Sequence, residues 1–164
     1  QQVIADYKRT NKIKAMEFSD RMKKLVEEYN NRHLDDFTVQ VLDEVTKQLN
    51  DLLNDIKVDK EKFKELGISF EEKAFYDILV SCAQKFHFDN QYPDDKMKDL
   101  AKKVKSLVDD KTKYTDWDQR IDVKAEMEAD LMILLDDNGY PPVPRNEVYN
   151  EVFEQAENFK KFIE

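Results

Sequence analysis

Acidic and hydroxyl side chains gather in the stretch LGISFEEKAFYDIL, residues 66–79, where they could serve as acid–base groups. General acid–base catalysis needs a titratable side chain held within hydrogen-bonding reach of a reacting proton. The chain has 36 Asp and Glu residues, so close carboxylate pairs also arise by chance. Ser69 and Glu72 have the spacing of a capping box, which begins a helix. We therefore expect structural roles here, including a hydrogen-bonded tertiary contact for Tyr76 and Asp77.

Metal ligands and nucleophiles are scarce in this chain. The two histidines, His33 and His87, have no second His or Cys at the spacing of a zinc site. Cys82 lies among apolar residues at helical spacing, which is typical of a buried free cysteine. Two glycines cannot build a glycine-rich phosphate loop. We therefore predict no catalytic residue, no metal site and no cofactor site within these residues.

Composition indicates the kind of fold that holds these side chains. A chain of 164 residues suits one domain, and two glycines with four prolines leave little turn chemistry for a sheet of many hairpins. The single cysteine allows no intrachain disulfide and fits a reducing compartment. No apolar run is long enough to span a membrane, and no signal peptide is visible. Because residue 1 is Gln rather than Met, we expect a processed chain or a piece of a longer polypeptide.

Apolar residues at helical spacing predict an all-α fold, a bundle of about six long helices plus one short helix. Gly67 and the pair Asn138-Gly139 are the expected helix ends, and the sequence YPPVP after the second of these is a strong stop. Residues 1–17 are expected to be a linker or a helix continuing from upstream, with the helical domain over 18–164. The predicted long helices are 18–29, 36–57, 69–86, 93–108, 116–138 and 146–162, with a short helical turn at 59–65.

Charge is unevenly distributed along the chain. Residues 1–34 carry eight Lys and Arg against five Asp and Glu, whereas residues 116–164 carry five against thirteen. The basic N-terminal residues could contact DNA phosphates, although interleaved acidic residues favour an ordinary solvated helix face. The acidic C-terminal third could steer towards a basic protein surface. The candidate DNA contacts are Lys8, Arg9, Lys12, Arg21, Lys24 and Arg32.

Five blocks of sequence, read in order, resemble the C-terminal helical domain of type I restriction enzyme R subunits. The blocks are EEYNNR (27–32), LGISFEEKAFYDIL (66–79), YTDWDQR (114–120), LLDDNGYPP (134–142) and EVFEQAE (151–157). The resemblance implies a cytoplasmic parent chain that is a site-specific deoxyribonuclease. Such a parent has an N-terminal nuclease domain and two RecA-like motor domains that use ATP and Mg to pull DNA. The resemblance assigns no catalytic residue to this chain.

The same resemblance implies what the helical domain does. It would dock the motor onto the methyltransferase core, made of modification and specificity subunits, and DNA would be reached through the full complex. One helix departs from the family pattern, because Glu126, Glu128 and Asp130 stand where basic residues are expected. These acids, together with Trp117, are therefore the predicted partner interface, although core packing is the favoured role of the tryptophan. The alternatives are a DNA-path element or an unrelated helical adaptor.

Overall fold

The computed structural model describes residues 2–32, 39–113 and 116–161. These residues form seven α-helices and one 3-10 turn, without any strand, so the predicted all-α fold is confirmed. None of the described helices is both long and apolar enough to cross a membrane. The elements are α1 (Gln2–Thr10), α2 (Lys12–Asn30), α3 (Val39–Leu66), α4 (Phe70–Lys85), α5 (Asp94–Lys111), η2 (Trp117–Gln119), α6 (Ile121–Asp137) and α7 (Asn146–Lys161).

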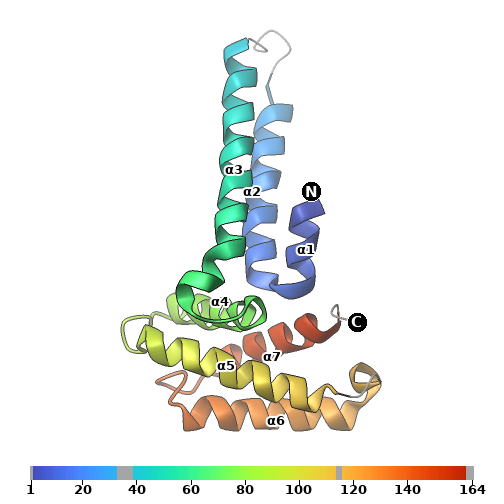
Figure 1. The fold of residues 1–164 in the computed structure, drawn as a ribbon, viewed down its shortest axis with the longest axis vertical. Helices are drawn as coiled ribbons and strands as arrows, with labels where there is room; N and C mark the ends of the chain where they lie inside the picture. The colour runs from blue at the N-terminus through green and yellow to red at the C-terminus, as the bar shows by residue number, and fades with distance from the viewer. Residues whose placement is uncertain (1, 33–38, 114–115, 162–164) are drawn as a thin grey trace.

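The molecule has two regions, which we call the arm and the base. The arm consists of α2 and α3, which run side by side as a long hairpin, with α1 packed beside its lower half (Figure 1). The base consists of α4, α5, α6 and α7 with the η2 turn, and α4 lies across the foot of the arm (Figure 1). Helix α4 therefore has the arm on one side and the rest of the base on the other.

Each region has its own apolar core. Among the described residues, the arm core contains six buried members: Ile4, Tyr7, Ala15, Phe18, Leu52 and Ile56. The base core is four times larger and draws on all four base helices. Tyr140, which follows α6, is fully buried there, and its hydroxyl donates a 2.6 Å hydrogen bond to the Leu79 carbonyl oxygen of α4. Tyr140 therefore joins the end of α6 to α4 in the base.

Three helices of the base and arm end in the same way. Gly67, His87 and Gly139 follow α3, α4 and α6 with φ values of 68°, 60° and 67°. After α3, the amide of Ile68 bonds to the carbonyl oxygen of Phe63, as in a Schellman motif. The two glycine ends confirm the sequence prediction. His87 occupies this strained position although it has a Cβ, and its side chain is exposed.

The sequence prediction was wrong about the helix around residue 58. A break was expected between residues 57 and 59, but α3 runs without interruption from Val39 to Leu66. No glycine or proline lies in this segment, so nothing local stops the helix. The predicted short helix 59–65 is thus the end of α3, and the short helix of the fold is α1. The predicted start of this helix at residue 36 lies outside the described residues.

The N-terminal residues also differ in detail from the prediction. Helix α1 ends at Thr10, and Asn11 caps α2 by accepting a hydrogen bond from the Lys14 amide. The boundary expected after residue 17 therefore falls inside α2. Whether residues 1–17 continue from an upstream domain stays a prediction.

The segment before α6 also departs from the prediction. The sequence predicted one helix over residues 116–138, with Trp117 packed in the core. Instead Trp117 lies in the η2 turn, Arg120 is extended, and α6 begins at Ile121, whose side chain is 84% exposed. Asp116, where the predicted helix 116–138 begins, makes no side-chain capping bond.

Candidate functional site

A buried lysine sits between the arm and the base. Lys73, on the arm-facing side of α4, is only 2% exposed. Its ammonium group lies 3.0 Å from Asp59 Oδ2 of α3 and 2.6 Å from Asp77 Oδ2, one turn further along α4. A buried charge without partners is very costly, so these two carboxylates are what make the position possible.

The same two carboxylates accept hydrogen bonds from the N-terminal helices. The Tyr7 hydroxyl of α1 donates to Asp59 Oδ2 at 3.0 Å, and the Asn11 side-chain amide donates to Asp77 Oδ2 at 2.6 Å. The ammonium group of Lys14 on α2 lies 3.8 Å from Asp59 Oδ1. These contacts join α1, α2, α3 and α4 at one point, which we call the polar junction.

The electrostatics of the polar junction follow from its burial. Burial raises the pKa of Asp77 above its ordinary value, and outweighs the lowering by Lys73 and by the bond from Asn11. Burial, together with the charge of Asp59, likewise raises the pKa of the Tyr7 hydroxyl. An open cleft of 360 Å³ reaches the two carboxylates from the side. Among the described side chains, no buried polar atom lacks a hydrogen-bond partner. Every polar group of the junction is thus used within the domain, where it holds the arm on the base.

The polar junction was only partly visible in the sequence. The predicted tertiary contact of Tyr76 and Asp77 is confirmed, because Asp77 binds Asn11 and the Tyr76 hydroxyl donates to Asp94 Oδ1 at 2.6 Å. The buried role of Lys73 was missed. The available signal was its spacing four residues before Asp77, but that pattern is also typical of exposed ion pairs.

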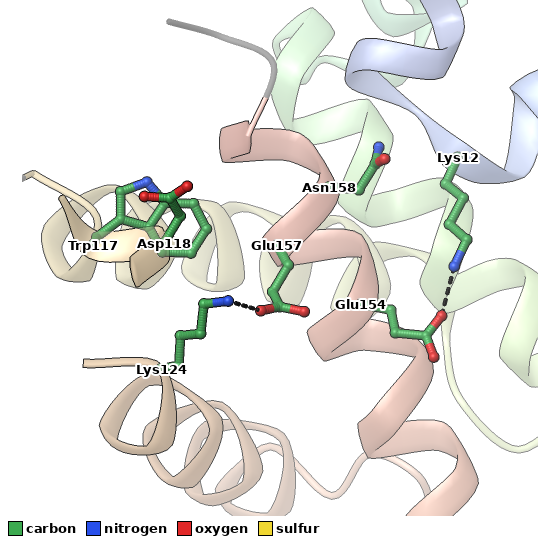
Figure 2. A pocket seen from close by; sticks show the side chains of 7 residues that line it. All are labelled: Lys12, Trp117, Asp118, Lys124, Glu154, Glu157 and Asn158. Carbon is green, nitrogen blue, oxygen red and sulfur yellow. Dashed lines mark hydrogen bonds and ion pairs between the residues drawn. The ribbon is translucent and has the colours of Figure 1, made fainter. Parts of the chain in front are cut away.

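The predicted partner residue Trp117 is 3% exposed and belongs to the base core. Its remaining edge borders an open cleft of 490 Å³ beside α7, together with Lys12, Asp118, Lys124, Glu154, Glu157 and Asn158. Figure 2 shows two ion pairs across α7 at this cleft, between Lys124 and Glu157 at 3.0 Å and between Lys12 and Glu154 at 2.5 Å. Most of the indole surface is therefore used inside the domain, and a role as partner anchor stays a prediction.

The three predicted acidic residues of α6 do not lie in one environment. Glu126 and Asp130 both lie 2.6 Å from the ammonium group of Lys111 on α5. The hydrogen bonds that this ammonium group donates to Asp130 and Glu126 raise its pKa. Glu128 is exposed and, within the described part of the chain, has no ion-pair partner. The structure thus brings two of the acids together and leaves Glu128 facing solvent.

The predicted basic residues are spread along the arm rather than gathered. Lys8 and Arg9 occupy the last turn of α1, and Arg32 follows the far end of α2. Arg21 pairs with Asp55 of α3 at 2.7 Å, and Lys12 is already paired with Glu154. The remaining four, Lys8, Arg9, Lys24 and Arg32, form no ion pair with the described residues. Their contact with DNA stays a prediction.

Helix α6 carries apolar side chains on two sides. Its inner side contributes Val123, Met127, Leu131 and Leu135 to the base core. Its outer side exposes apolar side chains at the spacing i, i+4, i+8, i+11 and i+12, which we call the α6 strip: Ile121, Ala125, Ala129, Met132 and Ile133. The sequence analysis missed the strip. The signal that could have found it is the presence of Ile121, Met132 and Ile133 outside the inward apolar stripe of the helix.

The arm exposes a second set of apolar side chains. A hollow of 250 Å³ between α2 and α3 is lined by Leu25, Val26, Tyr29, Val45 and Leu49. Further exposed apolar side chains on α3 include Val39 and Leu42. In Figure 1 the arm and α6 lie at opposite ends of the molecule.

The described residues contain no group of three or more His, Cys, Asp or Glu side chains that could hold a metal ion. Cys82 is buried, and burial raises the pKa of its thiol, as do the charge and hydrogen bond of Glu151. The thiol is therefore held in its protonated form. His33 lies outside the described residues.

Comparisons with known proteins agree with the sequence resemblance. A family model described as type I restriction enzyme HindI endonuclease subunit-like, C-terminal, matches residues 1–162. The putative type I restriction enzyme MjaIXP endonuclease subunit of Methanocaldococcus jannaschii is 28% identical over 149 residues. The type I restriction enzyme HindI endonuclease subunit of Haemophilus influenzae is 28% identical over 148 residues.

In each case the match covers 90% of this chain and 13% of the relative. The chain thus spans about one-eighth of the length of these relatives. No solved structure matches. Because the family model covers nearly the whole sequence, the chain belongs to the family of C-terminal domains of type I restriction enzyme HindI endonuclease subunit-like proteins.

Proposed function

We propose that this chain is the non-catalytic docking domain of a type I restriction endonuclease motor subunit. It joins the nuclease and translocase to the methyltransferase core, made of modification and specificity subunits, in the cytoplasm. ATP and Mg belong to other domains of the same subunit in this proposal. The names of the relatives support a restriction endonuclease parent, since both are called endonuclease subunits.

The observation that carries this proposal is the position of the two exposed apolar surfaces. The α6 strip belongs to α6 and the apolar hollow to α2 and α3, and these helices lie at opposite ends of the molecule (Figure 1). Exposed apolar surface on a soluble domain is typical of sites that bind another protein. A domain that joins two bodies needs two separate contact surfaces, and a rigid helical domain holds them at a fixed separation.

A binding experiment tests the proposal directly. The chain is titrated against the purified complex of modification and specificity subunits, and binding is followed by calorimetry or by pull-down. We expect a dissociation constant in the micromolar range or below, because a specific interface buries enough area for this affinity. A helical protein of similar size and net charge is the control. Lack of binding by a chain that is folded by circular dichroism would contradict the proposal.

A second candidate is a DNA-path element, in which the N-terminal helices contact duplex DNA. Exposed cations without an ion pair among the described residues, such as Lys8 and Lys24, favour it. Its affinity for DNA should fall steeply with salt, because each phosphate contact releases counterions. A titration of the chain with duplex DNA at two salt concentrations measures the slope. Absence of binding at low salt rules this candidate out.

A further inference from the structure

We propose that the α6 strip is the surface through which this domain binds the methyltransferase core, on a partner surface that is apolar at its centre and basic at its border. This inference rests on the proposed function and names the surface that performs it. The energy of association would come from burying apolar side chains, and the acidic residues around them would select the partner.

The first argument is the contrast between α6 and its neighbours. On α4, α5 and α7, the exposed side chains of the described residues are polar, such as Lys85, Asp99 and Glu154. On α6, Ile121 and Ile133 are 84% and 59% exposed, with Met132 between them in the strip. Within the base, α4, α5 and α7 therefore expose polar side chains to solvent, whereas α6 exposes apolar ones. This is the pattern of a surface that another protein covers.

The second argument is the charge around the strip. Helix α6 has six acidic residues and one lysine. Of these acids, Glu128, Asp136 and Asp137 are exposed, and none has an ion-pair partner within the described ranges. Acidic side chains bordering an apolar centre require Lys or Arg on the opposing surface, because unpaired or like charges weaken an interface.

The negative charge around the strip also distinguishes between the molecules that could bind there. Duplex DNA is excluded because its phosphates would face the carboxylates of α6. A second copy of the chain would bring an identical acidic border against the first, since a two-fold interface pairs the same patch with itself. The fitting occupant is a different protein with a basic border.

The third argument concerns the rest of the endonuclease subunit. The matching family is named for the C-terminal part of such subunits, so the preceding chain joins at α1. Helix α1 packs beside the arm, and in Figure 1 the helices α4 and α7 lie between it and α6. In this proposal the motor therefore adjoins the arm side of the domain, and the α6 strip stays accessible to the methyltransferase core.

The experiment compares three forms of the chain in the binding assay with the modification and specificity complex. The double variant Ile121→Ser, Ile133→Ser removes the two most exposed apolar side chains of the strip and should weaken binding at least tenfold. The matched control is Val58→Ser, which removes a similarly exposed apolar side chain from α3 and should change affinity less than twofold. Circular dichroism and a thermal melt check that all three forms are folded.

The outcomes distinguish the inference from the proposed function. If the unmodified chain binds and the double variant binds equally well, the α6 assignment is wrong and the docking function stands. If the unmodified chain does not bind, both fail. Sedimentation of the chain alone tests the other occupant. A dimer that the double variant abolishes would show that the strip pairs with a second copy, and would overturn the assignment.

The acidic border gives an independent measurement. The double variant Asp136→Asn, Asp137→Asn should slow association with the complex and reduce the salt dependence of its rate, with little effect on dissociation. The control is Asp43→Asn on the arm, which is also exposed and should leave the association rate unchanged. An association rate that is insensitive to both salt and the α6 substitutions would contradict a basic partner surface.

Discussion

The base and the arm are both built from amphipathic helices, but the apolar faces of these helices are buried to different extents in the two regions. In the base every helix packs against at least two others, and Leu79, Leu100 and Val104 are fully buried. In the arm, burial changes along α3. Leu52 and Ile56 near the foot are buried, whereas Leu42 near the other end is 47% exposed. Burial is therefore set by the number of neighbouring helices rather than by the apolar stripe itself.

This comparison predicts where the stability of the domain lies. The base has the larger core. In the arm beyond its foot, α2 and α3 pack mainly on each other and bury less apolar area per residue. The foot of the arm gains its remaining stability from α1, α4 and the polar junction. The first and largest test is therefore directed at this connection.

Removing the buried lysine should have the largest effect. The substitution Lys73→Ala leaves Asp59 and Asp77 close together without the buried cation that contacts both, and should destabilise the domain by about 3–5 kcal/mol. Urea unfolding measures the loss, and hydrogen exchange should show that the amides of the arm open before those of the base. The triple variant Lys73→Met, Asp59→Asn, Asp77→Asn leaves no uncompensated charge and should recover part of the loss. A cost below about 1 kcal/mol for Lys73→Ala would mean that the junction does not hold the arm.

Truncation of one leucine in each region tests the difference in burial. Leu79→Ala in the base removes a fully buried side chain and should cost about 2–5 kcal/mol, from lost burial and the cavity left behind. Leu53→Ala on the arm, at a side chain that is 42% exposed, should change the free energy of unfolding by only about 0.5 kcal/mol. Equal losses of unfolding free energy for the two variants would show that apolar side chains of the arm are buried as completely as those of the base.

The pH dependence of stability should have opposite signs for two carboxyl groups, Asp77 at the polar junction and Asp109 on α5 of the base. Burial raises the pKa of Asp77 at the junction above 3.8, so only between pH 3.8 and the raised pKa does the folded chain keep a proton that the unfolded chain has released. Stability from this group falls as the pH rises from 3.8 through the raised pKa. Burial would also raise the pKa of Asp109 in the base, but hydrogen bonds from Lys105 and Lys160 outweigh it and lower the pKa.

Asp109 therefore contributes stability above its unfolded pKa, and this contribution is lost as the pH falls through the lowered value. Unfolding free energies of Asp77→Asn and Asp109→Asn across the acid range should deviate from the unmodified chain in opposite directions. The effect of Asp109→Asn should be less than about 1 kcal/mol, because solvent screens its partly exposed pairs. Deviations of the same sign would contradict the assignment of the two environments.

The smallest effect is expected for the ion pair on the surface of the arm. Arg21 and Asp55 are about as close as Lys73 and Asp77, but their side chains are 40% and 56% exposed. Solvent and side-chain entropy offset such pairs, so Arg21→Gln should change the free energy of unfolding by about 0.5 kcal/mol or less. The double variant with Asp55→Asn measures the coupling, which added salt should weaken further. A coupling as large as that of the polar junction would mean that another surface covers the arm here.

Much of the fold was predictable because helices begin, continue and end for local reasons. The capping box of Ser69 and Glu72 is present, with the Glu72 amide donating to the serine hydroxyl and the glutamate accepting from the serine amide. The positive φ of Gly67 and Gly139 also follows from residue type. The wrong prediction for α3 also has a local explanation, because a helix break was expected at residue 58 although no glycine or proline lies there.

The sequence alone determined the helical class, most helix ends and the inward stripe of the base, because these depend on contacts within a few residues. The tertiary structure decided which polar faces are covered. Lys73 and Asp77 form the same i, i+4 pattern as an exposed pair, and only the crossing of the arm over α4 buries them. It also decided that the outer apolar face of α6 stays exposed, because none of the other described helices packs there. Contacts between residues far apart in sequence set both outcomes, and no local pattern encodes them.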